Sequence, residues 1–469
     1  MTLVILVADG ARPDTLRGAL DAGALPALAR LRAEGALCTI SSVFPSVTGP
    51  AYTPFLMGRY PGPVGLPGIR WWDRTHAATS WPDHARSYVG IQARHADTDL
   101  APDAPTLFEL APSSLASLTP LGRGLARSRR LGFNWGFALK AAWTHFRGDV
   151  RGWLAIDRAI AARAAERIHR ERPAFAFIVH PGIDKVSHAV GHAHHTVRDA
   201  LRIVDDTAAL IRANAERGGY WNHMQLWVVS DHGHSPVSQH EDLAGLMAHW
   251  GLRVCAHPWT MLGGPDCAVM VSGNAMSHVY LELGHTTRPF WPELAARWEP
   301  IAERLLQRDS VDLLVLPYSV SLCEVRARGA RGAAFVRRDG ARYSYEPVDG
   351  GDPLGLGAAV SVDGEAAAHD ACASSDYPDA LVQLAHLAGA ARSGEMILSA
   401  ARGWDFRARY EPIPHVSSHG ALHRDHMEVP LLVGRPPART PRRTVDIMPS
   451  ALDAMGLPIP AGLDGTSFT

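Results

Sequence analysis

Cysteine is scarce in this sequence, and its spacing argues against two common kinds of site. The 469 residues include five cysteines, none of them in a CxxC pair: Cys38, Cys255, Cys267, Cys323 and Cys372. The odd count and wide spacing argue against a disulfide framework and against cysteine-ligated zinc. Because the chain has 24 histidines, a bound metal is expected to use histidine and carboxylate ligands.

The sequence also lacks a strong net charge and a long apolar run. Its formal net charge is -1, so no overall field attracts it to nucleic acid or to an anionic membrane. No run reaches the roughly 18 apolar residues of a transmembrane segment. The early apolar run, residues 3–8, is too short for a signal peptide and no basic region precedes it. We therefore expect a cytoplasmic globular protein without a nucleic-acid partner.

Three short apolar runs are followed by carboxylate or histidine side chains. Residues 3–8, 174–180 and 226–230 are typical of buried parallel strands. Asp9 follows the first run, and Asp231 and His232 follow the third. Ligand sites in open α/β sheets form at the carboxyl ends of strands. Asp9 alone could equally cap a helix, but together these side chains indicate a site at one sheet edge.

Helical patterns separate these strands and indicate an α/β fold. Helices are expected over residues 13–34, 153–172, 196–216 and 292–307, and residues 58–73 are expected to form a loop. We expect a single core over residues 1–469, with residues 80–150 as an insertion over the site and residues 340–390 as a small cap or surface excursion.

A basic segment, residues 123–130, is followed by an aromatic one, residues 133–137. The simpler interpretation is a surface helix that packs its aromatic residues inward. The alternative is a face that contacts lipid or nucleobases.

Thr48 lies in a turn that suits a reactive hydroxyl. Residues 36–44 are expected to form a strand, and Pro45 and Pro50 bracket the turn. Pro50 suits the first position of a helix. The helix N-terminus would favour an anion, and a deprotonated threonine there is a nucleophile. The alternative is a threonine that only caps the helix.

Asp184 and His188 are four residues apart, so on a helix they share one face. Such a pair holds a metal ion or forms a salt bridge. Together with the residues at the other strand ends, it predicts a hydrolase with two metal ions. Aspartate and histidine ligands without cysteine favour zinc, with manganese as the alternative.

In their order along the chain, these motifs resemble the alkaline phosphatase superfamily, most closely its nucleotide pyrophosphatase/phosphodiesterase branch. The matching pieces are residues 7–14, 44–48, 58–61, 184–188, 230–233, His419-Gly420 and the tail 446–465. The resemblance implies a three-layer sandwich, with a mostly parallel central sheet and helices on both faces. It also implies cleavage of small phosphodiester or pyrophosphate substrates.

The resemblance further implies a role for each motif residue. One metal would be surrounded by Asp9, Thr48, Asp231 and His232, and the other by Asp184, His188 and His419. Thr48 would attack phosphorus and form a phosphothreonine intermediate. His419 is chosen over the nearby histidines because Gly420 follows it, as in the family.

One departure leaves the substrate class open. Ile69 stands where the family carries a phosphate-binding asparagine, and it cannot form a hydrogen bond. Arg70 could bind the phosphate oxygen instead, with Lys185 as a second cation, or it could form a surface ion pair. A phosphomonoesterase or phosphonate hydrolase is the main alternative, and a non-catalytic metal-binding protein is another. A sulfatase is disfavoured because Thr48 replaces its cysteine or serine.

Overall fold

The computed structural model describes residues 1–74, 84–89, 91–132, 135–258, 264–407, 411 and 413–469. Its centre is a seven-stranded sheet in which β1 (Thr2–Ala8) pairs in parallel with β7 and β8. Only β21 runs against the other strands. The sheet order is β2 (Ala36–Ser41), β21 (Glu428–Val433), β8 (Met224–Val229), β1, β7 (Phe175–His180), β5 (Ser114–Ser117) and β6 (Arg130–Leu131).

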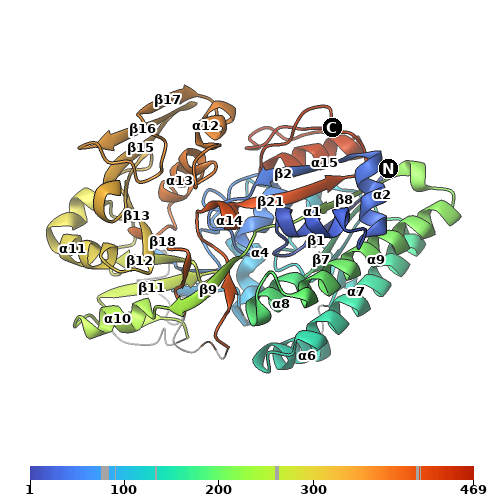
Figure 1. Cartoon of the computed structure of the whole chain (residues 1–469), viewed down its shortest axis with the longest axis horizontal. Helices are drawn as coiled ribbons and strands as arrows, with labels where there is room; N and C mark the ends of the chain where they lie inside the picture. The colour runs from blue at the N-terminus through green and yellow to red at the C-terminus, as the bar shows by residue number, and fades with distance from the viewer. Residues whose placement is uncertain (75–83, 90, 133–134, 259–263, 408–410, 412) are drawn as a thin grey trace.

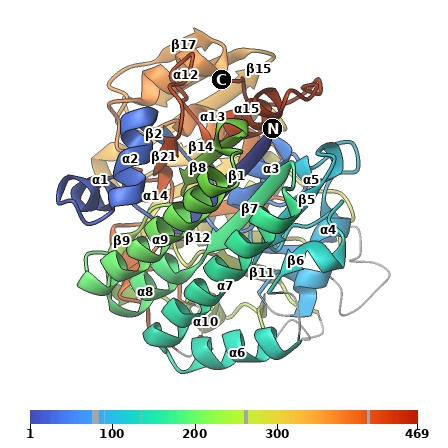
Figure 2. The ribbon, with the colours of Figure 1, turned by 90° about the vertical axis from the view of Figure 1, so that its right-hand side faces the viewer.

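Alternate residues of β1 enter two different cores, so the strand is apolar throughout. Leu3, Ile5 and Val7 belong to one core, and Val4 and Leu6 to the other. Helices cover both faces of the sheet, as Figures 1 and 2 show. A strand covered on both faces needs a continuous apolar run rather than alternation. The expected α/β three-layer fold is therefore confirmed.

The helices on the two faces come from different parts of the chain. The core shared with Val4 includes residues of α1 (Pro13–Asp21), α2 (Pro26–Glu34), α7 (Val150–Glu171), α8 (Gly182–Val190) and α9 (His195–Arg217). The core shared with Leu3 includes residues of α3 (Thr53–Met57), α5 (Leu107–Leu110) and α15 (Ile447–Met455). Among the described residues, every helix is too short or too polar to span a bilayer.

A second, mostly antiparallel sheet of nine strands forms the other lobe in Figure 1. Its order is β10 (Val254–Ala256), β11 (Cys267–Ser272), β12 (Met276–Leu281), β18 (Met396–Ala400), β13 (Val311–Pro317), β14 (Leu322–Arg326), β15 (Ala333–Asp339), β16 (Arg342–Val348) and β17 (Val360–Asp363). The helices of this lobe include α11 (Trp291–Leu306), α12 (Glu365–Cys372) and α13 (Ala380–Ala388).

Local structure departs from expectation in the 58–150 region. A short strand, β3 (Arg70–Trp72), lies inside the segment expected to be a loop and pairs with β4 (Ala85–Ser87). The expected insertion contains β5 and β6, which extend the central sheet, and the surface helix α6 (Trp135–Phe146). The division of the chain into a core and two added segments stays a prediction.

Candidate active site

The predicted ligands meet because their strands are neighbours in one sheet. Asp9 directly follows β1, Asp231 and His232 lie just beyond β8, and α8 follows β7 and carries Asp184 and His188. Since β1, β7 and β8 are parallel, their carboxyl ends lie at the same edge. Gly233 lets the backbone after β8 pass close to that of Asp425, because a Cβ there would overlap the carbonyl oxygen of Asp425.

Thr48 lies at the centre of the first group. Its Oγ1 is 3.2 Å from Asp9 Oδ1 and 3.3 Å from His232 Nε2. Asp9, Asp231 and His232 offer ligand atoms that all lie within 4.8 Å of one another. The Tyr52 hydroxyl donates to Asp9 Oδ2 at 3.3 Å. The structure thus brings together the four residues that the sequence placed around one metal.

The second group surrounds Asp184. Its Oδ1 is 3.1 Å from His188 Nε2 and 3.4 Å from His419 Nε2. A third imidazole, that of His234, is closer still, with Nε2 at 2.9 Å. Asp184, His232, His234 and His419 offer ligand atoms within 4.8 Å of one another. His234 was not among the predicted site residues, although it stands two positions after His232.

Backbone carbonyls orient the histidine rings toward the site. His188 Nδ1 donates to the Ser417 carbonyl at 2.8 Å, and His419 Nδ1 donates to the Ser46 carbonyl at 3.0 Å. In a neutral ring each Nε2 then carries a lone pair, and both lone pairs face the same Asp184 carboxylate. Lone pairs opposite a carboxylate oxygen repel it, whereas a cation among these atoms would bind them all.

The buried charges also fit a metal centre. Asp231 Oδ2 is buried without a hydrogen-bond partner among the described residues. Burial and the neighbouring Asp9 raise the pKa of Asp231 to about 7. Against the effect of burial, Asp231 and Asp9 raise the pKa of His232 to about 9. Both pKa values are raised because buried carboxylates lie close together and attract protons. A divalent cation would balance the same negative charge without those protons, so the residues present fit bound metal ions.

Lys185 and Arg70, the two side chains predicted to bind substrate, contact different carboxylates. Lys185 Nζ lies 2.8 Å from Asp184 Oδ2, beside the second group. Although burial opposes it, the Asp184 carboxylate raises the pKa of Lys185, which keeps the ammonium charged. Arg70 is buried on β3, with NH1 3.8 Å from Glu411 Oε1.

Arg70 connects to the second group through a polar chain that the sequence did not indicate. Asn274 donates to Glu411 Oε2 at 2.6 Å and lies 3.0 Å from His415 Nδ1. The His415 ring in turn stacks on His188, with centroids 3.9 Å apart. Arg70 is therefore linked to His188 through Glu411, Asn274 and His415.

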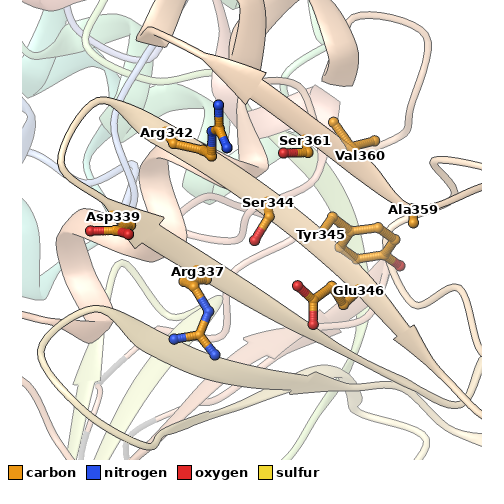
Figure 3. Close-up of a pocket in the computed structure, with 9 residues that line it drawn as sticks. All are labelled: Arg337, Asp339, Arg342, Ser344, Tyr345, Glu346, Ala359, Val360 and Ser361. Atoms are coloured by element: carbon orange, nitrogen blue, oxygen red, sulfur yellow. The ribbon is translucent and has the colours of Figure 1, made fainter.

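A separate cavity lies at the outer edge of the second sheet. Its volume is about 390 Å³, and Figure 3 shows residues of β15, β16 and β17 around it, including Arg337, Tyr345 and Ser361. None of the metal-ligand groups described above contributes to its lining.

The family comparison gives the class of protein: a phosphoester hydrolase, with which the buried Asp/His groups, suited to metal ions, are consistent. The family model for type I phosphodiesterase / nucleotide pyrophosphatase matches residues 3–288, more than half of the chain. This chain belongs to that family. The match contains Thr48 and the candidate metal-binding residues from Asp9 to His234, while His419 lies beyond it. No curated protein matches the sequence.

Solved structures share the fold at low sequence identity. The phosphonoacetate hydrolase of Sinorhizobium meliloti 1021, in complex with phosphonoformate, is similar with a TM-score of 0.59 and 16% identity, covering 97% of this chain and 96% of that one. An inactive variant of murine ectonucleotide pyrophosphatase / phosphodiesterase 5, in complex with AMP, has a TM-score of 0.57 and 13% identity, with 98% and 96% covered. Likeness at this identity supports the fold alone.

Proposed function

We propose that this protein cleaves phosphodiester or pyrophosphate bonds of small molecules, with Thr48 as the nucleophile and two metal ions, chiefly zinc. The observation that carries the proposal is the position of Thr48 Oγ1, which lies 3.2 Å from Asp9 and 3.3 Å from His232. The second ligand group is adjacent, because His232 belongs to both groups.

The residues that would hold the metals fall into two sets. Asp9, Asp231 and His232, with Thr48, would hold one ion; Asp184, His188 and His419 would hold the other. When bound, such ions lower the pKa of a coordinated hydroxyl or water and stabilise charge on the phosphoryl group. Manganese is the alternative to zinc, since carboxylate and imidazole ligands suit both.

The chain's own groups carry out two displacements. Thr48 gives up its proton to solvent, its Oγ1 forms a bond to phosphorus, and the bond from phosphorus to the leaving oxygen breaks. The leaving oxygen takes up a proton from solvent. Water then loses a proton to solvent as it attacks the phosphothreonine, the Oγ1–phosphorus bond breaks, and Oγ1 takes up a proton from solvent to restore the hydroxyl. Two in-line displacements give net retention at phosphorus.

The positive side chains near the site favour a substrate whose phosphoryl group carries one negative charge rather than two. Lys185 is bound to Asp184 at 2.8 Å, and the charge of Arg70 is partly offset by Glu411. Neither cation is therefore wholly free to balance a second negative charge. A phosphodiester carries one charge at phosphorus, whereas a monoester carries about two and needs more positive charge.

A phosphonate hydrolase is the second candidate, because Ile69 replaces the phosphate-binding asparagine and a phosphonoacetate hydrolase shares the fold. The test compares kcat/KM for bis-p-nitrophenyl phosphate, p-nitrophenyl phosphate and phosphonoacetate, with wild type and Arg70→Ala. The proposal expects the diester to have the highest value and Arg70→Ala to change it little. A higher value for the monoester or the phosphonate, falling sharply in Arg70→Ala, would instead assign Arg70 to a dianionic group.

The covalent step has its own test. Acid quenching during turnover, followed by mass spectrometry, should find phosphate on Thr48. A protein that holds metal but turns over none of these substrates and carries no phosphate on Thr48 would be a binding protein.

A further inference from the structure

Helix α6 (Trp135–Phe146) presents its large apolar side chains to solvent. The exposed fractions are 80% for Trp135, 69% for Leu139, 65% for Trp143 and 64% for Phe146. The buried residue of the helix is Thr144, which is small and polar. A surface helix normally has the opposite arrangement, with its apolar side chains facing the core. The expectation that the aromatic residues here pack inward is therefore wrong for Trp135, but it holds for Phe137, which is half-buried and packs against the core shared with Val4. Phe133 lies outside the described residues.

These four side chains form one continuous stripe. Their positions, at intervals of four, four and three residues, repeat on the same face of a helix. Large exposed apolar patches mark sites of interaction with proteins, membranes or ligands. Tryptophan and phenylalanine beside leucine are typical of helices that lie in the interfacial region of a lipid bilayer.

Basic residues border the apolar stripe. Lys140 and Arg147 are exposed and seven residues apart, so they line the same flank of the helix. The Arg147 guanidinium lies 5.2 Å from the centre of the Trp143 ring. Residues 110–148 contain six lysines and arginines and no acidic residue. Three of these six, Arg123, Arg129 and Arg130, form ion pairs with carboxylates outside that range. The positive charge beside the stripe therefore comes from Lys140 and Arg147, and it complements an anionic surface.

Helix α6 lies at the periphery of the protein, next to α7, as Figures 1 and 2 both show. Helix α7 in turn packs against α8, the helix that carries Asp184 and His188. A surface bound to α6 would therefore lie on the side of the molecule that these helices form.

We propose that α6 docks this protein on an anionic lipid surface, with the stripe of Trp135, Leu139, Trp143 and Phe146 in the interfacial layer and with Lys140 and Arg147 against the headgroups. The apolar area and the cations act together, which is the pattern of amphipathic helices that bind lipid without spanning it.

Vesicle flotation of the full-length protein tests this directly. The probes are vesicles of phosphatidylcholine alone and of phosphatidylcholine with 30% phosphatidylglycerol. Wild type should float with the anionic vesicles and much less with the neutral ones. The triple variant Trp135→Ser/Leu139→Ser/Trp143→Ser should lose binding, and Lys140→Gln/Arg147→Gln should weaken it roughly thirtyfold, the effect of about two cations at an anionic surface.

The control variant is Val320→Ser/Ile459→Ser, which removes exposed apolar side chains elsewhere (70% and 45% exposed) and should bind like wild type. Thr48→Ala should also bind normally, so failure of the proposed chemistry would not affect this readout. All α6 variants should keep the Tm of wild type, which shows that they are folded whether or not the proposed chemistry holds. Equal binding by wild type and triple variant would overturn the proposal. The stripe would instead belong to a contact between two copies of the protein if wild type sedimented as a dimer and did not bind vesicles, and if the triple variant sedimented as a monomer.

Discussion

The most informative perturbation of the site is at His234, which lies 2.9 Å from Asp184 through Nε2 and 3.2 Å from the Ser417 hydroxyl through Nδ1. The ring is fully buried, and burial lowers its pKa to about 3, so it is neutral near pH 7. A neutral ring either donates a hydrogen bond from Nε2 to Asp184 or offers a lone pair there as a metal ligand.

Two substitutions distinguish these roles. His234→Gln retains an amide N–H that can reach Asp184, and His234→Leu does not. A hydrogen bond to a charged group contributes about 1.5–3 kcal/mol, and about 2 kcal/mol corresponds to roughly thirtyfold. This agrees with the roughly 10–100-fold loss of metal affinity or activity seen when partners of metal ligands are removed.

The assay is metal affinity by competition with a chelator, together with kcat/KM for a soluble diester. If His234 positions Asp184, His234→Leu should lose about thirtyfold in affinity and His234→Gln should recover most of it. If His234 ligates the metal, both variants should lose more than about a hundredfold. Values for His234→Leu within about twofold of wild type would refute both roles, because they would show that the contact with Asp184 contributes little.

Three further predictions follow from the same groups. Thr48→Ala should abolish turnover but keep most of the bound metal, while Thr48→Ser should keep part of the activity; normal turnover by the alanine variant would exclude Thr48 as nucleophile. Chelation should lower Tm, because metal at about a thousandfold its Kd stabilises the fold by about 4 kcal/mol and the freed carboxylates repel; an unchanged Tm and full activity would contradict a metal centre. Burial raises the pKa of Asp157 in the folded protein well above 3.8, so the folded state keeps a proton that the unfolded state loses. The free energy of unfolding of wild type should therefore fall as pH rises from about 3.8 toward the raised pKa. Asp157→Asn should therefore have a higher Tm than wild type at pH 8 but not near pH 4, and thermal melts at both pH values check this.

Sequence alone determined the framework of the site. The run of residues 3–8 became β1 because a strand buried on both faces must be apolar throughout, and that pattern is local. The same reasoning located β7 and β8, so Asp9, Asp184 and Asp231 could be placed at strand ends before any contact was known. The link to His419 came from resemblance, because no local pattern connects it to Asp184.

Tertiary structure decided which side chains meet. His234 contacts Asp184, which is fifty residues away in the sequence, and hydrophobic periodicity carries no information about such a contact. The contacts among Glu411, Asn274 and Arg70 join segments more than a hundred residues apart, so they depend on how β3 and the segment that contains Glu411 pack beside the second sheet. The outward face of α6 has the same origin: an apolar helix is compatible with burial or exposure, and only packing against neighbouring elements decides between them.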